Sequence, residues 1–168
     1  AYPADALSAT LDRNDPPFRE GSKIPPGWHL FYIREVVKLE DTAVDGHPKR
    51  GDFLPPIDLP RRMWAGTEAV YHKPLYVGET IRRTSTIKSV VPKIGKTGNL
   101  VFLQLIHEIK GENGLAVTEK QEVVFREEDK PGSTQTHPLP FPSRKATWSR
   151  KIHPTPVMLF RFSALTMN

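Results

Sequence analysis

The run from Pro60 to Gly66, Pro-Arg-Arg-Met-Trp-Ala-Gly, has the most unusual composition in the chain. Guanidinium groups bind carboxylates and phosphates through paired hydrogen bonds, and an indole ring stacks against cations and planar groups. We therefore expect Arg61, Arg62 and Trp64 to contact an anionic or planar part of a ligand from a loop before the sheet. Gly66 ends the run and is predicted to belong to the same substrate-binding site. The alternative is a tryptophan that covers one sheet face while both arginines lie in solvent.

Other residue types with catalytic potential form no familiar constellation. The chain has six histidines, which are His29, His47, His72, His107, His137 and His153. None are paired at the spacing of metal ligands and the chain has no cysteine, so no metal site is predicted. No serine lies in a G-x-S-x-G pattern, and no two carboxylates stand out as an acid–base couple. Because most acidic residues neighbour basic ones, they are expected to be solvated, and residues 1–155 show no active site by residue chemistry alone.

Two local patterns favour a structural role. Gly95-Lys96-Thr97 is similar to the end of a phosphate-binding loop, but Val90 stands where that motif needs its first glycine. The triplet is also expected between two strands, so it is interpreted as a hairpin turn. His107 shares a predicted strand face with Leu103 and Leu105, which favours a hydrogen-bonded core histidine over a catalyst.

Length and composition limit the classes of protein to which the chain can belong. A chain of 168 residues, 38% of them hydrophobic, suits one domain plus a tail. The net charge is +5, but the basic residues are scattered among acids, which does not favour a nucleic-acid partner and suits a small anionic ligand. No apolar run is long enough for a membrane span, and no secretory signal is visible. The absence of cysteine fits a reducing, intracellular compartment.

The predicted secondary structure is mainly β. The last three strands, joined by short glycine-containing loops, are expected to form an antiparallel meander with period-two apolar faces. The predicted strands are Glu68–His72, Thr80–Val91, Leu100–Lys110 and Leu115–Arg126. Residues 38–60 show no helical stripe.

The two ends of the chain are less regular. Leu7–Leu11 is predicted to form a turn of helix, and Trp28–Ile33 is predicted to form a short aromatic strand. Residues 129–143 are rich in proline and indicate a linker. Trp148–Ile152 is a candidate strand, and Pro156–Asn168 is expected to form an apolar strand that turns into a second element. Thirteen residues cannot bury a core, so this last segment must lean on the preceding domain or on a continuation.

Three motifs together resemble one known family. They are Gly51–Gly66, Val70–Ile81 with its proline followed by Gly-Glu-Thr, and Gly114–Glu127. They are similar to the N-terminal half of the MaoC-like, double-hotdog acyl-thioester hydratases. Within that family they most resemble the mesaconyl-C4-CoA hydratases and the type 2 hydroxyacyl-thioester dehydratases. The resemblance runs from about residue 7 to residue 168.

The resemblance implies an α+β hotdog fold, an antiparallel sheet with a short or degenerate central helix. It divides the chain into an N-terminal hotdog domain (residues 1–128), a linker (129–147) and the beginning of a catalytic second hotdog (148–168). Phe160–Asn168 resembles the lead-in to the hydratase motif. Asn168 stands where other members have a catalytic aspartate, although an asparagine amide cannot act as a base.

The implied function is that of an acyl-CoA hydratase or dehydratase acting on an enoyl- or 3-hydroxyacyl-CoA such as mesaconyl-CoA, with this chain as its non-catalytic, substrate-tunnel part. No cofactor is implied beyond the CoA thioester substrate. The resemblance also implies a homodimer or pseudo-dimer formed through hotdog sheet pairing, no membrane partner, and a location in the cytoplasm or the mitochondrial matrix. Two alternatives stay open: a stand-alone module that binds acyl thioesters, and a hotdog thioesterase, for which residues 53–66 offer only Asp58 as the required carboxylate.

Overall fold

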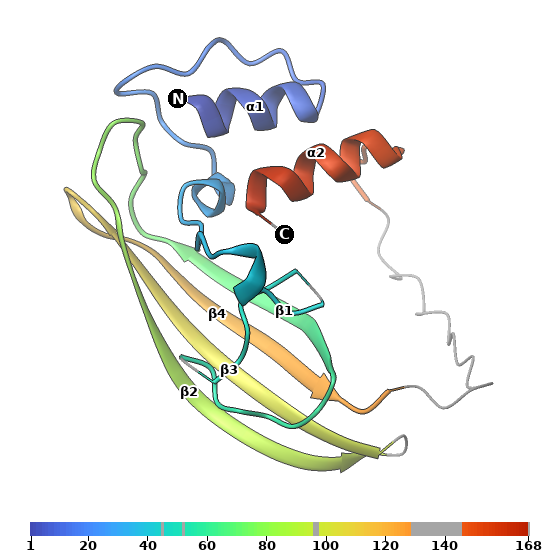
Figure 1. Ribbon diagram of the computed structural model, residues 1–168. Coiled ribbons are helices and arrows are strands. Elements are labelled where there is room, and N and C mark those ends of the chain that lie inside the picture. The colour runs from blue at the N-terminus through green and yellow to red at the C-terminus, as the bar shows by residue number, and fades with distance from the viewer. Residues whose placement is uncertain (45, 52, 96–97, 129–145, 168) are drawn as a thin grey trace.

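The centre of the protein is one antiparallel sheet of four long strands (Figure 1). The computed structural model describes residues 1–44, 46–51, 53–95, 98–128 and 146–167. The strands are β1 (Arg61–Tyr71), β2 (Arg82–Gly95), β3 (Gly98–Gly111) and β4 (Gly114–Arg126), and they pair in the order β1-β4-β3-β2. The predicted meander of the last three strands is therefore confirmed, as is the α+β class with its antiparallel sheet.

Strand β3 illustrates why these segments form a half-buried sheet. Leu103, Leu105, His107 and Ile109 alternate along the strand and are all buried. Side chains at every second position of a strand lie on the same face, so these four point to the inner face of the sheet. The face predicted from the period-two pattern is thus confirmed.

Strand β1 begins earlier than the sequence predicts. The expected loop over residues 60–66 is wrong, because residues 61–71 pair continuously with β4 apart from an irregularity between Trp64 and Gly66. Pairing with β4 satisfies the backbone hydrogen bonds of this segment, and that outweighs the turn signals around Pro60. β1 is an edge strand, since its other side has no neighbour among the described residues.

The described residues between 18 and 59 cover the inner face of the sheet without a long central helix. The described residues of this segment contain only two short 3₁₀ helices, η1 (Trp28–Phe31) and η2 (Leu39–Asp41) (Figure 1). The rest of this segment is pinned by contacts such as those of Arg50, which donates to the carbonyl oxygens of Ile57 (2.8 Å) and Leu59 (2.6 Å). The short or degenerate central helix implied by the family resemblance agrees with this arrangement.

The predicted strand at Trp28–Ile33 is wrong. Gly27 precedes it with a positive φ of 85°, and the chain then turns into η1. This turn carries His29 and Phe31 into the interior, where both are buried. Packing of those two side chains therefore outweighs the strand propensity of the aromatic run.

Two α-helices lie beyond one end of the sheet and pack against each other (Figure 1). They are α1 (Tyr2–Thr10) and α2 (Pro156–Thr166). Leu7 of α1, Phe31 of η1 and Leu165 of α2 form a small buried cluster, and the Phe162 ring meets the Phe31 ring edge-on at 5.3 Å. The last segment thus leans on the preceding domain, as expected from its length.

The strands predicted near the C-terminus are wrong. Residues 148–152 are irregular, and the apolar run from Pro156 is helical. Thr155 caps α2, because its side-chain oxygen accepts the backbone N–H of Met158 at 3.1 Å, and Pro156 suits the first helical turn. No helix in the described parts of the chain is long and apolar enough to cross a membrane.

Candidate functional site

A row of polar side chains crosses the inner face of the sheet between two apolar clusters. Ser85 of β2 lies opposite His107 of β3, which lies opposite Glu119 of β4. One apolar cluster around Ile109 and Val117 lies on one side of this row, and another around Leu103, Leu105, Val123 and Phe125 lies on the other. Polar groups in such a position must be hydrogen-bonded to one another or line a cavity.

The centre of this polar row is a buried pair formed by Glu119 and His29 of η1. His29 Nε2 lies 3.1 Å from Glu119 Oε1, and the two side chains are only 2% and 8% exposed. The hydrogen bond from His29 lowers the pKa of Glu119, and the nearby His107 and Arg83 act in the same direction while burial opposes it. Glu119 is therefore held as a carboxylate in the protein interior.

His107 is fully hydrogen-bonded within the polar row. Its Nδ1 lies 2.7 Å from the Ser85 hydroxyl and its Nε2 lies 3.1 Å from Gln121 Oε1. The prediction of a hydrogen-bonded core histidine is thus confirmed. With both ring nitrogens engaged, His107 is a poor candidate for moving a proton to or from a ligand.

A cleft of about 600 Å³ lies beside the polar row, between the sheet and residues 35–54. Cationic or titratable groups reach it from several strands, and apolar side chains complete its wall. Its lining includes Arg62, Arg83, His107, Gln121, Phe53 and Leu105. A cleft of this size with two guanidinium groups can accept an elongated ligand that carries negative charge.

The structure separates the residues that the sequence grouped together. Arg62 lies opposite the buried Phe125 and lines the cleft. Arg61 is the next residue along β1, so its side chain points to the other face of the sheet. Of the predicted substrate-binding residues, only Arg62 lines this cleft.

Trp64 and Gly66 lie further along the edge strand. Trp64 is 67% exposed, and its indole N–H donates to the Thr67 hydroxyl at 2.9 Å. An added Cβ at Gly66 would meet no atom within 4 Å, so no close approach requires glycine there. Asn168, the predicted catalytic residue, lies outside the described residues.

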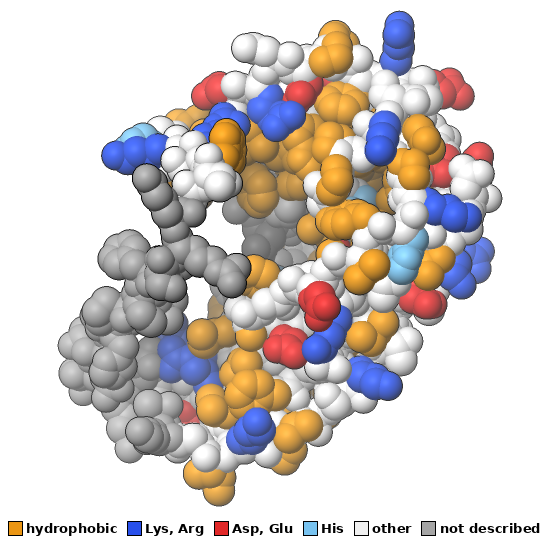
Figure 2. Space-filling view, turned by 180° about the vertical axis from the view of Figure 1, so that it is seen from behind, with side chains coloured by type: hydrophobic (Ala, Val, Ile, Leu, Met, Phe, Trp, Pro, Cys, Tyr) orange, Lys and Arg blue, Asp and Glu red, His pale blue; other side chains and the backbone are white. Residues whose placement is uncertain are grey.

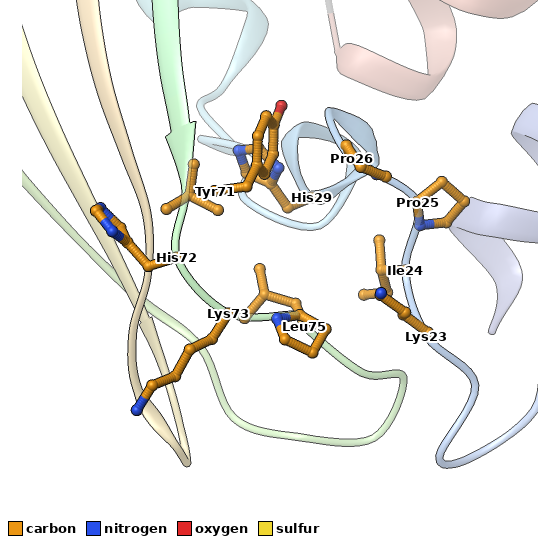
Figure 3. A pocket seen from close by; sticks show the side chains of 11 residues that line it. Lys23, Ile24, Pro25, Pro26, His29, Tyr71, His72, Lys73 and Leu75 are labelled. Atoms are coloured by element: carbon orange, nitrogen blue, oxygen red, sulfur yellow. The ribbon is translucent and has the colours of Figure 1, made fainter.

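A second cavity of about 210 Å³ lies next to His29 of the buried pair. Figure 3 shows that it is enclosed by residues 23–29 on one side and 71–75 on the other. His29 contributes to its wall, and the Tyr71 ring meets the His29 ring edge-on at 6.3 Å. Burial and the charge of Glu119 raise the pKa of the Tyr71 hydroxyl, so it stays protonated. The His29 ring thus connects the Glu119 carboxylate to this second cavity.

The buried pair is the feature that reasoning from the sequence missed. Glu119 was expected to be solvated because Lys120 follows it, but it is 6% exposed. One signal was present: Glu119 shares the period-two face of Val117 and Val123, so the strand pattern places it inward. No local signal marks His29, which is 90 residues away in sequence.

The described residues form neither a metal-binding cluster nor the helix-borne carboxylate that a hotdog thioesterase requires. They contain no group of three or more histidine, aspartate or glutamate side chains that could hold a metal ion. Asp58, the carboxylate considered for thioesterase chemistry, is exposed in an irregular segment. No helix places it over the sheet.

Comparison with known proteins gives consistent results. The sequence profile described as "Hydroxyacyl-thioester dehydratase type 2" matches residues 27–168. Mesaconyl-C(4)-CoA hydratase of Chloroflexus aurantiacus is 38% identical over 165 residues, which cover 98% of this chain and 59% of that protein. The chain therefore spans about three fifths of the length of this relative.

Solved structures support the fold. HtdX of Mycobacterium tuberculosis matches 99% of this chain and 59% of its own chain, with 14% identity and a TM-score of 0.54. A thioesterase of Thermus thermophilus, solved with coenzyme A and zinc, matches 81% of this chain and 93% of its own at 16% identity, but its TM-score of 0.33 supports no argument. The fold is thus the antiparallel hotdog arrangement that the motifs imply. With residues 27–168 matched, the chain belongs to the type 2 hydroxyacyl-thioester dehydratase family.

Proposed function

We propose that this chain is the non-catalytic, substrate-binding half of an acyl-CoA hydratase or dehydratase. The reaction adds water to an enoyl-CoA or removes it from a 3-hydroxyacyl-CoA, with mesaconyl-CoA as a representative substrate. The observation that carries the proposal is the 38% identity, over nearly the whole chain, to a protein named as a mesaconyl-C(4)-CoA hydratase.

The cleft between the sheet and residues 35–54 is the proposed position of the substrate. Its apolar wall suits an acyl chain, and Arg62 with Arg83 suits a carboxylate or phosphate of a CoA thioester. The described residues between 18 and 59 form no long central helix, which leaves room for this cleft above the sheet.

The chemistry itself is assigned to groups outside the described residues. Hydration of an enoyl thioester places negative charge on the thioester oxygen, which backbone N–H groups stabilise, while a general base takes a proton from water. His107 has both ring nitrogens hydrogen-bonded, and His29 is held by Glu119. Asn168 would orient a ligand or a water molecule through its amide, because an amide cannot accept the proton.

The sheet edge at β1 is the proposed site of pairing with a second hotdog, in a homodimer or a pseudo-dimer. Met63, Trp64, Val70 and Tyr71 on this strand are 45–67% exposed, and long exposed edges tend to pair. Figure 2 shows acidic, basic and hydrophobic side chains mixed across one face of the molecule. The mixed surface charge gives no support to a nucleic-acid partner.

We propose that the enzyme is located in the cytoplasm or the mitochondrial matrix.

The proposal is tested by incubating the full-length protein with crotonyl-CoA and mesaconyl-CoA and following the products by mass spectrometry. A gain of one water per thioester is the expected result. Release of free CoA without addition of water would indicate a thioesterase instead. Tight binding of both thioesters with no change in mass would indicate a binding module.

A further inference from the structure

The second cavity, enclosed by residues 23–29 and 71–75, has preformed and mostly apolar walls (Figure 3). The backbone N–H of Ile24 donates to the carbonyl oxygen of Leu75 at 2.8 Å, which ties the two walls together. Apolar surface is supplied by Ile24, Pro25, Pro26, Pro74, Leu75 and Val117. The cavity therefore needs no rearrangement to accept a small apolar group.

His29 is the buried polar residue in this wall, and its protonation pattern is set by Glu119. Nε2 of the ring lies 3.1 Å from Glu119 Oε1. A carboxylate can only accept a hydrogen bond, so Nε2 carries the proton that they share. A neutral imidazole ring holds a single N–H, which leaves Nδ1 of His29 with a lone pair that can accept a hydrogen bond.

Nδ1 of His29 has no hydrogen-bonding partner among the described residues, although the side chain is only 2% exposed. It is not sealed off, because it is not among the fully buried, unpartnered atoms of the described side chains. Two other polar side chains of the wall are occupied: His72 Nε2 lies 3.0 Å from the Thr118 hydroxyl, and the Lys73 ammonium donates to the Asn113 carbonyl oxygen at 2.6 Å. An acceptor without a partner in apolar surroundings requires a donor from outside the protein.

We propose that this cavity binds a small neutral molecule with a hydroxyl group on an apolar body, of the class of short-chain alcohols and phenols. The hydroxyl donates to Nδ1 of His29, and the apolar body lies against the proline, leucine and valine side chains. A carboxylate is disfavoured, because it offers no proton to Nδ1 and is repelled by the Glu119 carboxylate. The cavity of about 210 Å³ is adequate in size, since a dry cavity of about 150 Å³ can hold a benzene molecule. The site is separate from the cleft lined by Arg62, so it is independent of the proposed hydratase activity.

The test is a titration of the isotopically labelled full-length protein with phenol, followed by NMR. We expect saturable amide shifts at residues 23–29 and 71–75, together with a shift of the His29 Nδ1 resonance. Fluorobenzene, which has nearly the same shape without the hydroxyl, should bind about fivefold more weakly and leave that resonance in place, because it donates no hydrogen bond. The imidazole nitrogen resonances also report the tautomer, and a proton on Nδ1 in the free protein would contradict the proposal.

The variant Glu119→Gln removes the carboxylate that holds the proton on Nε2, so the ring can adopt the tautomer in which Nδ1 is protonated. Phenol should then bind about fivefold more weakly, while fluorobenzene, whose binding reports an intact cavity, should bind as it does to the wild type. Glu122→Gln is the matched control, since Glu122 is on the same strand but its side chain is 50% exposed and does not line the cavity.

The proposal is overturned if phenol causes no shifts in the two segments, or if the Glu119→Gln variant keeps the preference for phenol. Equal binding of phenol and fluorobenzene to the wild type would also overturn it, and would leave a water molecule as the partner of Nδ1. This wild-type comparison decides alone if the variant does not fold.

Discussion

Two regions of the same sheet lie in opposite environments. One is the polar row formed by Ser85, His107 and Glu119, and the other is the segment Arg61–Gly66. His107 and Glu119 of the row are buried on the inner face and Ser85 is half-buried, while the segment begins an exposed edge strand. The edge segment has the unusual composition, yet only Arg62 of its predicted residues reaches the cleft. Strand register therefore identifies polar groups in the interior more reliably than unusual local composition does.

The two regions also differ in what holds them in place. His29 and Glu119 are withdrawn from water, so each depends on the other to satisfy its polar atoms. Trp64 is exposed, and its one hydrogen bond is to a neighbouring hydroxyl. Substitutions in the buried region should consequently affect stability, and substitutions at the edge should affect ligand binding or assembly.

The largest expected effect comes from His29→Ala. It leaves the Glu119 carboxylate buried without its main partner, which should lower the free energy of unfolding by about 3–5 kcal/mol. Chemical denaturation measures this loss. His72→Ala is the matched control, because His72 is an exposed histidine at the same cavity and should cost less than about 1 kcal/mol. Equal losses in the two variants would contradict the special role of the buried pair.

The pH dependence of stability should identify Glu119 as the charged member. Because the folded state lowers its pKa from 4.5, the unfolded state binds more protons in acid, and stability falls as pH decreases. Glu119→Gln should be less stable than the wild type above the ordinary glutamate pKa, and the difference should shrink as pH falls through the lowered pKa. Unfolding free energies between about pH 6 and pH 2 test this. A difference that stays constant over that range would show that the charge of Glu119 contributes nothing.

The two adjacent arginines provide the sharpest comparison within the edge strand. Arg62→Gln in the full-length enzyme should raise KM about tenfold with little change in kcat, since it removes a charge-assisted contact to the bound substrate. Arg61→Gln should leave KM within about twofold, because this side chain lies on the other face of the sheet. Steady-state kinetics with one CoA thioester measures both. Equal increases would place the substrate outside the cleft.

The smallest effect on stability is expected for Trp64→Ala. With two thirds of its surface exposed, Trp64 should contribute less than about 1 kcal/mol to the free energy of unfolding. Chemical denaturation checks this, and size-exclusion chromatography of the same variant reports on pairing at the β1 edge. A loss above about 2 kcal/mol would mean that the indole is part of the core.

The sheet could be predicted from sequence because its signal is local. Alternating apolar residues and short glycine turns mark β2, β3 and β4, and the family motifs cover the same strands. α2 could also have been recognised, since Thr155 followed by Pro156 is typical of a helix start. The apolar residues that follow this cap have a strong strand propensity, which hides the helix start.

The site could be predicted only in part because its contacts are long-range. The His29–Glu119 pair joins residues 90 positions apart, and η1 had to be recognised as a turn of 3₁₀ helix before His29 could be placed inside. Gly27, with its positive φ, marks that turn, but neighbouring aromatic residues favour a strand. The separation of Arg61 from Arg62 likewise follows from strand pairing, which the turn-rich flanking sequence hides.

The most direct test of the central claim uses the isolated 168-residue chain, with circular dichroism confirming that it is folded. Binding of crotonyl-CoA is measured by isothermal titration, and turnover is measured by mass spectrometry beside the full-length enzyme. We predict that the isolated chain binds the thioester, loses affinity in the Arg62→Gln variant and forms no hydrated product. Hydration by the isolated chain at a rate comparable to that of the full-length enzyme would contradict the account.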